Sequence, residues 1–209
     1  FEKRVNDLNN ELLKVVKPEE DCRQSSLVYK EKLRHIKSEY AAQQNDLLLL
    51  NDSFEAVFKY IDELFEQFEE FVENAQYDDA NAILPKVDQI LHEVSSALPD
   101  LANLCTLVVS IIPDKFISLE NAYEEMIADN YPLSHLNVKS SIRSMKNDLD
   151  RLTTRIKRFD LKDVHLELDN IVSHIDEFFV RFNEEKEAKE KFLENNEGVY
   201  STVNLIERK

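Results

Sequence analysis

The sequence predicts an all-α chain, an elongated rod of three-helix bundle repeats joined by long continuous helices. Three observations support this prediction: a helical apolar pattern, its recurrence 84 residues later, and a scarcity of glycine. One Gly among 209 residues leaves few turns that need a positive φ angle, which favours long helices. An apolar content of 43% can supply the buried faces of such helices and argues against disorder.

The apolar repeat consists of two stripes, and each stripe occurs twice at a shift of 84 residues. Neighbouring apolar residues are three or four apart, which is the spacing of one helix face. The first stripe is Phe58, Ile61, Phe65, Phe68 and Val72, recurring as Ile142, Met145, Leu149, Leu152 and Ile156. The second is Leu84, Val87, Leu91, Val94 and Leu98, recurring as Leu168, Ile171, Ile175, Phe178 and Phe182. Such a unit stacks on its neighbours to bury its stripe, so a helical repeat is expected.

Short polar or proline-containing segments predict where the helices end. These segments are 17–20, 76–79, 112–114, 160–163 and 195–198, and the last two repeat the second and third at the same shift. The expected helices are therefore 1–17, 20–75, 79–111, 114–158, 163–195 and 199–209. Pro85 and Pro99 are expected to kink the third helix, and Pro132 to bend the fourth without reversing the chain.

The repeat also predicts a division of the chain. Residues 1–57 would hold the end of a preceding repeat and a long connecting helix, 58–131 one repeat, and 132–209 the next repeat, incomplete at its C-terminus. The chain begins and stops inside helical patterns, so we expect it to be an excerpt of a longer protein, with room for an anchor outside it.

Charge and cysteine content exclude several classes of protein. The net charge of −16 disfavours nucleic acid as a partner and disfavours binding flat on an anionic membrane. Two cysteines without a CxxC motif suit a reducing compartment and form no disulfide framework. We expect no signal peptide and no transmembrane helix, because the uncharged stretch 101–113 is shorter than the roughly 20 residues that a bilayer needs. Membrane contact is expected only through an anchor outside the chain.

No catalytic, metal or cofactor site is expected from the motifs. The patterns HExxH, Glu-x-x-His, GxGxxG and the P-loop are absent. His174 is expected to be exposed or at the core edge, and Cys105 to be a buried apolar residue. Cys22 is expected near a helix start after Pro18, a location that can lower a thiol pKa, but a reactive role is not expected.

Two matching segments of the repeats carry opposite charge. Residues 59–79 contain eight acidic residues and one Lys, whereas the matching segment 139–162 is rich in Lys and Arg. Arg151, Arg155 and Arg158 are expected to share one helical face. This face is either a solvated surface balanced by acids such as Glu167, Asp169 and Asp176, or a docking strip for an acidic or carboxyl-terminated partner segment.

Several short segments resemble one family. The segments 76–80 (QYDDA), 84–87 (LPKV) and 98–101 (LPDL) resemble the central cytoplasmic region of EzrA, the septation ring formation regulator of low-GC Gram-positive bacteria. Further matching segments are 112–113, 119–126, 131–136 and 184–189. The family's N-terminal transmembrane helix and its Gln-Asn-Arg patch have no counterpart in these residues.

The resemblance implies spectrin-like repeats, a membrane anchor before this segment, and a role in restraining assembly of FtsZ, the tubulin-like division protein. It places the protein at the cytoplasmic face of the bacterial membrane, at the division septum, as a non-catalytic scaffold. One alternative is a generic coiled-coil tether or filament protein, but the stripe spacing drifts from seven residues and prolines interrupt it. The other is an enzyme or metal-binding bundle, which needs polar residues at stripe positions that are apolar here.

Overall fold

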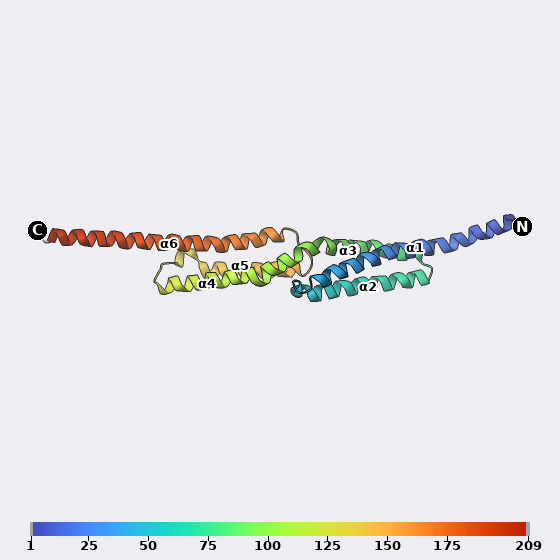
Figure 1. Cartoon of the computed structure of the whole chain (residues 1–209), viewed down its shortest axis with the longest axis horizontal. Helices are drawn as coiled ribbons and strands as arrows, with labels where there is room; N and C mark the ends of the chain where they lie inside the picture. The colour runs from blue at the N-terminus through green and yellow to red at the C-terminus, as the bar shows by residue number, and fades with distance from the viewer. Residues whose placement is uncertain (1, 208–209) are drawn as a thin grey trace. The chain divides into compact units, whose positions relative to one another are not determined.

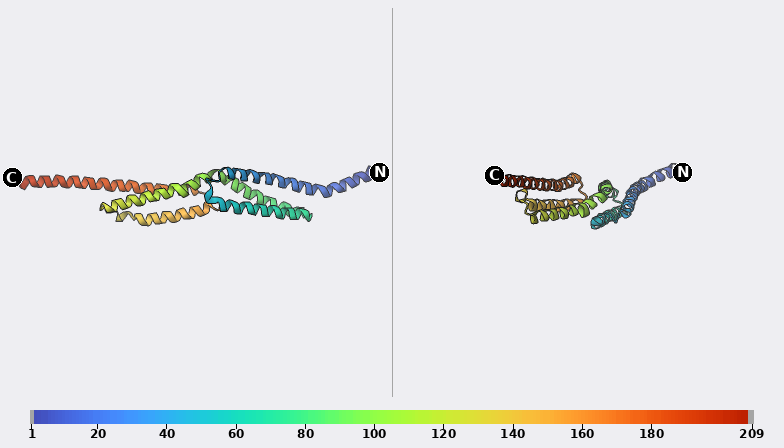
Figure 2. Two further views of the ribbon diagram at one scale, coloured as in Figure 1. Left: turned by 60° about the horizontal axis from the view of Figure 1, so that its bottom comes forward. Right: turned by 60° about the vertical axis from the view of Figure 1, so that its left-hand side comes forward.

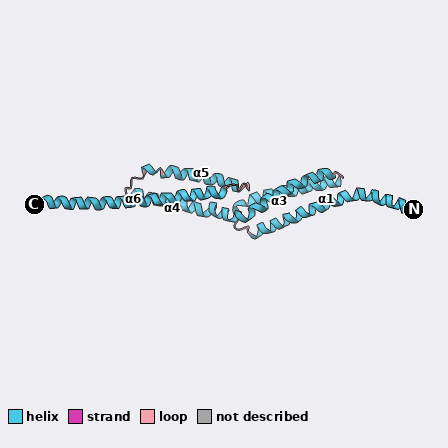
Figure 3. Ribbon diagram, turned by 90° about the horizontal axis from the view of Figure 1, so that it is seen from above, coloured by secondary structure: helices cyan, strands magenta, loops and turns pink. Residues whose placement is uncertain are grey.

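The computed structural model describes the backbone of residues 2–207 and the side chains of residues 16–193. All its elements are helices, and Figure 3 shows only helices and the loops between them, so the predicted all-α class is confirmed for the described chain. The elements are α1 (Glu2–Ala42), η1 (Leu48–Leu50), α2 (Asn51–Glu73), α3 (Tyr77–Thr106), η2 (Leu107–Ile111), α4 (Ile112–Ala128), η3 (Ser134–Leu136), α5 (Val138–Ile156) and α6 (Val164–Glu207). The elements η1 and η3 are 3-10 helices, and η2 is a π-helix.

The helices form two compact units, Phe1–Cys105 with Ile156–Asp160, and Thr106–Arg155 with Leu161–Lys209. In the first unit α1, α2 and α3 lie side by side (Figures 1 and 2). The ion pairs Lys30–Glu69 and Lys37–Asp62 show that α1 and α2 are antiparallel. The hydrogen bonds Cys22–Asn81 and Lys32–Asp88 show that α1 and α3 are parallel. The predicted repeat boundaries at 58–131 and 132–209 concern sequence repeats and stay a prediction.

The second unit has the same arrangement. Helices α4 and α5 are antiparallel, as the contacts Glu120–Lys146 and Tyr123–Lys139 show. Helices α4 and α6 are parallel, as the contacts Lys115–Asp176 and Tyr123–Phe182 show. Each unit is therefore a three-helix bundle in which the first and third helices run in the same direction.

The predicted apolar stripes form the cores of both units. Every stripe residue is buried except Phe58, which is half-buried, so this prediction is confirmed. Phe68, Leu152, Leu168 and Ile175 have no exposed surface. Each buried Leu, Ile or Phe side chain contributes about 1.5–3 kcal/mol relative to an exposed one. We call the buried stripes of a unit its seam. Burial of the seam is the main source of favourable free energy of folding.

Three of the predicted helix ends are wrong. Helix α1 continues through Pro18, the helical backbone is continuous from Tyr77 to Ala128 across 112–114, and α6 continues through 195–198. Each of the six predicted helices therefore has at least one wrong bound: 1–17, 20–75, 79–111, 114–158, 163–195 and 199–209. A proline removes one backbone donor, and the seam on either side keeps the helix together despite that loss. The segments 112–114 and 195–198 are equivalent in the repeat, so the helix continues at both.

The π-helical segment explains how the chain accommodates Pro113. A proline ring within an α-helix clashes with the carbonyl of the residue four positions earlier, which here is Val109. The segment Leu107–Ile111 lies directly before Pro113 and contains Val109. A π-helix has wider turns with i→i+5 hydrogen bonds, which moves that carbonyl away from the ring without ending the helix.

Two chain reversals were not predicted. The first, at residues 43–50, lies within the predicted helix 20–75, and the second, at 129–137, lies within the predicted helix 114–158. Pro132 belongs to the second reversal, so the expectation of a bend without reversal is wrong. The first reversal is held by Leu47 and Leu50, both with 0% exposure. In the second, Asn130 and Asn137 adopt positive φ angles of 60° and 52°, which Asn tolerates better than most residues.

The other two turns lie close to their predicted positions, at 74–76 and 157–163. They also reach positive φ without glycine, at Ala75 (57°) and Phe159 (59°). The Phe159 ring packs edge-on against Phe54 in the first unit, with 5.1 Å between ring centroids. This contact offsets the backbone strain of a bulky residue in the left-handed region. A low glycine content therefore did not prevent tight turns.

Both cysteines belong to the cores. Cys105 is 3% exposed, as predicted, and burial raises the pKa of its thiol to about 11. Cys22 is 1% exposed and donates a hydrogen bond to Asn81 Oδ1 at 3.4 Å. It lies inside α1 and not near a helix start, because α1 continues through Pro18. Burial raises the pKa of Cys22 as well, which disfavours the reactive thiolate.

We expect the buried seam to dominate stability, and two residues of α4 offer a matched comparison. Leu119 has 0% exposure and Ile117 55%. Leu119→Ala should lower the free energy of unfolding by about 2–5 kcal/mol, because it leaves a cavity in the second unit. Ile117→Ala should change it by no more than about 0.5 kcal/mol. Urea denaturation followed by circular dichroism measures both, and equal effects would contradict the packing described.

Cys105 should make stability depend on pH in the alkaline range. Its pKa rises from an ordinary 9.0 to about 11 in the folded chain. Below pH 9 the thiol is neutral in both states. As pH rises toward about 11 only the unfolded thiol ionises, so the contribution of Cys105 to stability is lost. Cys105→Ala removes this titration, so the stability difference between wild type and variant should shrink as pH rises. A constant difference would contradict the prediction.

Candidate functional site

Two of the three predicted docking arginines close the turn between α5 and α6. Arg155 Nη1 lies 2.7 Å from Glu167 Oε1, and Arg151 Nη2 lies 2.8 Å from Glu167 Oε2. Arg155 also donates to the backbone carbonyl of Lys162 in the turn. Glu167 lies in the first turn of α6, where the helix dipole favours a negative charge. One carboxylate thus binds two guanidinium groups and ties the end of α5 to the start of α6.

Arg158 lies apart from this cluster. Helix α5 ends at Ile156, so Arg158 belongs to the following turn and does not share the helical face of Arg151 and Arg155, contrary to expectation. Its side chain is exposed, and no ion pair of Arg158 is seen in the described chain. Of the acids expected to balance the strip, Glu167 does so, whereas Asp176 pairs with Lys115. A partner-binding role of the three arginines stays a prediction.

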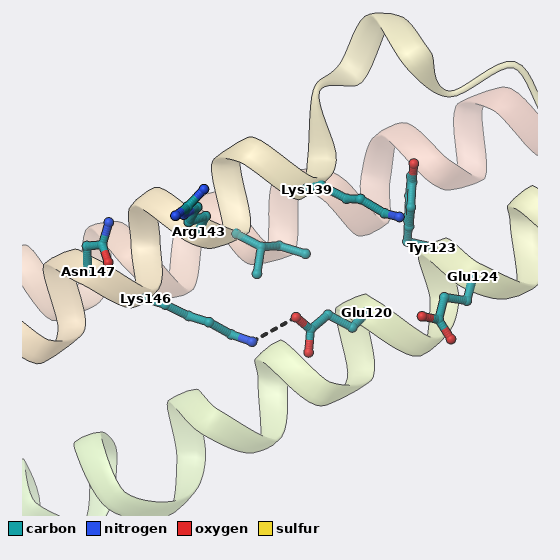
Figure 4. Close-up of a pocket in the computed structure, with 8 residues that line it drawn as sticks. Glu120, Tyr123, Glu124, Lys139, Arg143, Lys146 and Asn147 are labelled. Carbon is teal, nitrogen blue, oxygen red and sulfur yellow. Dashed lines mark hydrogen bonds and ion pairs between the residues drawn. The ribbon is translucent and has the colours of Figure 1, made fainter.

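A second cluster lies in a cavity of about 450 Å³ between α4 and α5 (Figure 4). Lys146 reaches across it to Glu120, with 2.7 Å between Nζ and Oε1. The Lys139 ammonium lies 5.7 Å from the centre of the Tyr123 ring, close enough for a cation–π interaction. The lining residues are Glu120, Tyr123, Glu124, Lys139, Ile142, Arg143, Lys146 and Asn147.

Sequence reasoning counted the basic residues of α5 but missed this cavity. The α4–α5 pairing was hidden because residues 114–158 were predicted as one helix. Recognising Asn130 and Asn137 as turn residues around Pro132 would have revealed it.

The acidic helix α2 has an equivalent environment in the first unit. Glu69 accepts from Lys30 at 2.8 Å and from Arg23 at 3.3 Å, and Asp62 pairs with Lys37 at 3.2 Å. The basic partners lie on α1 and the acids on α2, whereas in the second unit the acid lies on α4 and the base on α5. These carboxylates are partly neutralised by a neighbouring helix, which the sequence pattern of α2 alone did not show.

The described side chains do not converge on a catalytic arrangement. All five histidines are exposed, including His174, whose exposed or core-edge location is confirmed. His135 Nε2 lies 3.2 Å from Glu185 Oε1, and Nδ1 lies 3.0 Å from the carbonyl oxygen of Pro132, which accepts when Nδ1 carries the proton. The His135 side chain thus joins the α4–α5 turn to α6. Among the described residues no group of three or more His, Cys, Asp or Glu side chains is placed to hold a metal ion.

One helical run qualifies as a membrane span by length and composition alone. The run Tyr77–Ala128 has 52 residues, and 39% of its most apolar window is buried. No candidate was expected, because the longest uncharged stretch is short, but a window with few charges passes the same criterion. One such helix does not establish a span, since the core helix of a soluble protein also qualifies. Here the seam residues of α3 and α4 pack inside the units.

Comparison with known proteins gives one consistent family. Proteins named Septation ring formation regulator EzrA match the chain in Bacillus licheniformis (25% identity, 92% of this chain and 34% of the relative) and in Listeria monocytogenes serotype 4a (22%, 94% and 34%). The protein of the same name in Bacillus subtilis matches at 23% identity over 78% of this chain and 31% of its own length. No solved structure matches significantly. The chain thus spans about a third of the length of these curated relatives.

The family model described as Septation ring formation regulator, EzrA, matches residues 1–209, the whole chain. The curated relatives with the same name match most of this chain, and the described part of the chain is all-helical. The segments QYDDA, LPKV and LPDL carry the same resemblance in the sequence itself. We therefore assign this chain to the EzrA family of septation ring formation regulators.

Proposed function

We propose that this chain is a non-catalytic scaffold segment of a membrane-anchored cell-division regulator that modulates assembly of the FtsZ ring. The observation that carries the proposal is the family match over residues 1–209. The family is named for regulation of the septation ring, and no enzyme activity is part of that name. Because the chain covers about a third of its relatives, the anchor would lie in the remainder of the protein, on the cytoplasmic side of the membrane at the septum.

The structure suggests how such a segment would work. Each unit buries its apolar seam inside a three-helix bundle, which leaves long helix faces covered with charge. Within a unit these faces are held in fixed positions by packed side chains. A bundle of this kind presents protein-binding surfaces without needing a deep pocket. Opposite charge on the outer helices α2 and α5 would allow the two units to select different partners.

The alternative function, a generic coiled-coil tether or filament protein, has less support. Such a protein would bury its apolar stripes between chains. Here the stripes of both units are buried within a single chain, and Phe68, Leu91 and Leu152 are at most 2% exposed. The seams are therefore already occupied by helices of the same unit.

The proposal predicts that the chain acts on FtsZ polymers directly. Added to purified FtsZ with GTP, it should lower the amount of FtsZ that sediments as polymer, because it would occupy surfaces used in assembly. The pellet fraction at increasing chain concentration is the measurement, and a heat-unfolded sample of the chain is the control. Unchanged FtsZ sedimentation together with no binding in solution would place the activity outside this segment.

The arginine strip can be tested first at Arg158, which is exposed and shows no ion pair in the described part of the chain. Arg158→Glu should weaken binding to FtsZ by about 1 kcal/mol or less, since an exposed charge pair contributes little, and should leave the helix content unchanged. Lys86→Glu makes the same charge change at an exposed position of α3 in the first unit and should have no effect. Binding isotherms and circular dichroism provide the comparison.

The triple reversal of Arg151, Arg155 and Arg158 to Glu should weaken binding further, but it also places like charges beside Glu167 and loosens the α5–α6 turn. Arg151→Gln with Arg158→Gln avoids this repulsion and keeps Arg155 on Glu167. If neither this variant nor Arg158→Glu changes the affinity while helicity is intact, the strip is not the FtsZ contact.

A further inference from the structure

The cavity between α4 and α5 keeps a net positive charge, because three cations (Lys139, Arg143 and Lys146) line it against two carboxylates (Glu120 and Glu124). Lys146 is bound to Glu120, whereas the Lys139 ammonium faces the Tyr123 ring and not a carboxylate. Arg143 is exposed, and it forms no ion pair with any residue whose side chain the structure describes. Ile142, which is 5% exposed, adds an apolar side chain to the lining of the cavity. The surface is therefore suited to an acidic helix that also carries apolar atoms.

Helix α2 of the same sequence has the complementary surface. No Lys or Arg occurs between residues 60 and 76, and six acids lie between 62 and 73. Lys30 and Lys37 of α1 pair with Glu69 and Asp62. Glu66, Glu70 and Glu73 are exposed and show no ion pair in the described part of the chain. Three carboxylates thus remain available on one face of α2.

The two sets of charges have the same spacing along their helices. Glu66, Glu70 and Glu73 stand at steps of four and three, as do Lys139, Arg143 and Lys146. At a rise of 1.5 Å per residue each set spans about 10.5 Å, so three opposite charges can face one another along two adjacent helices. The net charge of −16 opposes self-association in general, so an attractive contact needs a locally positive surface such as this groove.

We propose that the groove between α4 and α5 binds α2 of a second copy of this chain, with Lys139, Arg143 and Lys146 facing Glu66, Glu70 and Glu73. The two surfaces differ, so each copy offers both a groove and an α2 face. Association of this kind either closes into a ring, a reciprocal dimer included, or continues into an open assembly. The proposal does not depend on the division role, because it uses only surfaces of this chain.

The test is sedimentation of the wild-type chain and of two surface variants. The mean mass of the wild-type chain should rise above that of a monomer as its concentration increases. Lys139→Glu with Arg143→Glu reverses two charges of the groove, and Glu66→Lys with Glu70→Lys reverses two charges of α2. The association constant of each variant alone should fall by about tenfold or more, because attractive charge pairs become repulsive. A control with the same charge change, Lys186→Glu with Lys191→Glu on exposed positions of α6, should associate like wild type.

Mixing the two surface variants gives the sharpest result. The groove of one variant and the α2 face of the other are both intact, and the two reversed surfaces are again opposite in charge. The mixture should therefore regain the association that each variant alone has lost. Circular dichroism confirms that each variant is folded. A wild-type chain that stays monomeric at all concentrations would overturn the proposal. The partner of the groove would then be an acidic segment of another protein. Groove variants that associate like wild type, or a mixture that forms no complex, would also overturn it.

Discussion

The structure depends on burial of one apolar seam inside each three-helix unit. The stripes on α2 and α3, and on α5 and α6, have few alternatives to this packing, because exposing them would cost about 1.5–3 kcal/mol for each large side chain. The seam also explains the irregular features. Helices continue through Pro18 and Pro99 because the flanking stripe residues remain packed, and Phe159 accepts a φ of 59° because its ring packs on Phe54. At these positions side-chain packing outweighs the local backbone preferences of proline and of a bulky residue at positive φ.

Charge is arranged on this frame with opposite polarity in the two units. Asp62 on α2 pairs with Lys37 on α1, whereas Lys146, which follows Asp62 by 84 residues, pairs with Glu120 on α4. If α5 packed beside α1, or α2 beside α4, like charges would face one another. The stripes of the two units are both apolar and have the same spacing, so apolar packing alone distinguishes little between the correct and the exchanged helix pairs. The ion pairs add that selectivity. Each pair is exposed and weak alone, yet several repelling pairs together discriminate between alternative bundles.

The seam and the turns at 74–76 and 157–163 could be predicted from the sequence, and the turns at 43–50 and 129–137 could not. Every stripe residue was identified because apolar spacing reports burial directly. The turns were missed where their signals were polar residues without Gly, as in Gln43–Gln44–Asn45–Asp46, and were predicted wrongly where proline lies inside a continuous helix, as at Pro113. The error at Pro132 then hid the α4–α5 groove. The arginine strip failed for a related reason: whether Arg158 shares a face with Arg155 depends on α5 ending at Ile156, a boundary fixed by the following turn.

The separation of an apolar core from a charged surface also explains how members of this family can share one fold at low sequence identity. A seam needs apolar side chains of suitable volume at helical spacing, and many combinations of Leu, Ile, Val, Phe and Met satisfy it. Identities of 20–25% to the curated relatives are compatible with one fold on these terms. Exposed charges such as Glu70 and Arg143 contribute little to stability and can vary without unfolding a unit. The charged faces of α2 and α5 can therefore change while the core stays intact, and the same apolar core can support surfaces of opposite sign.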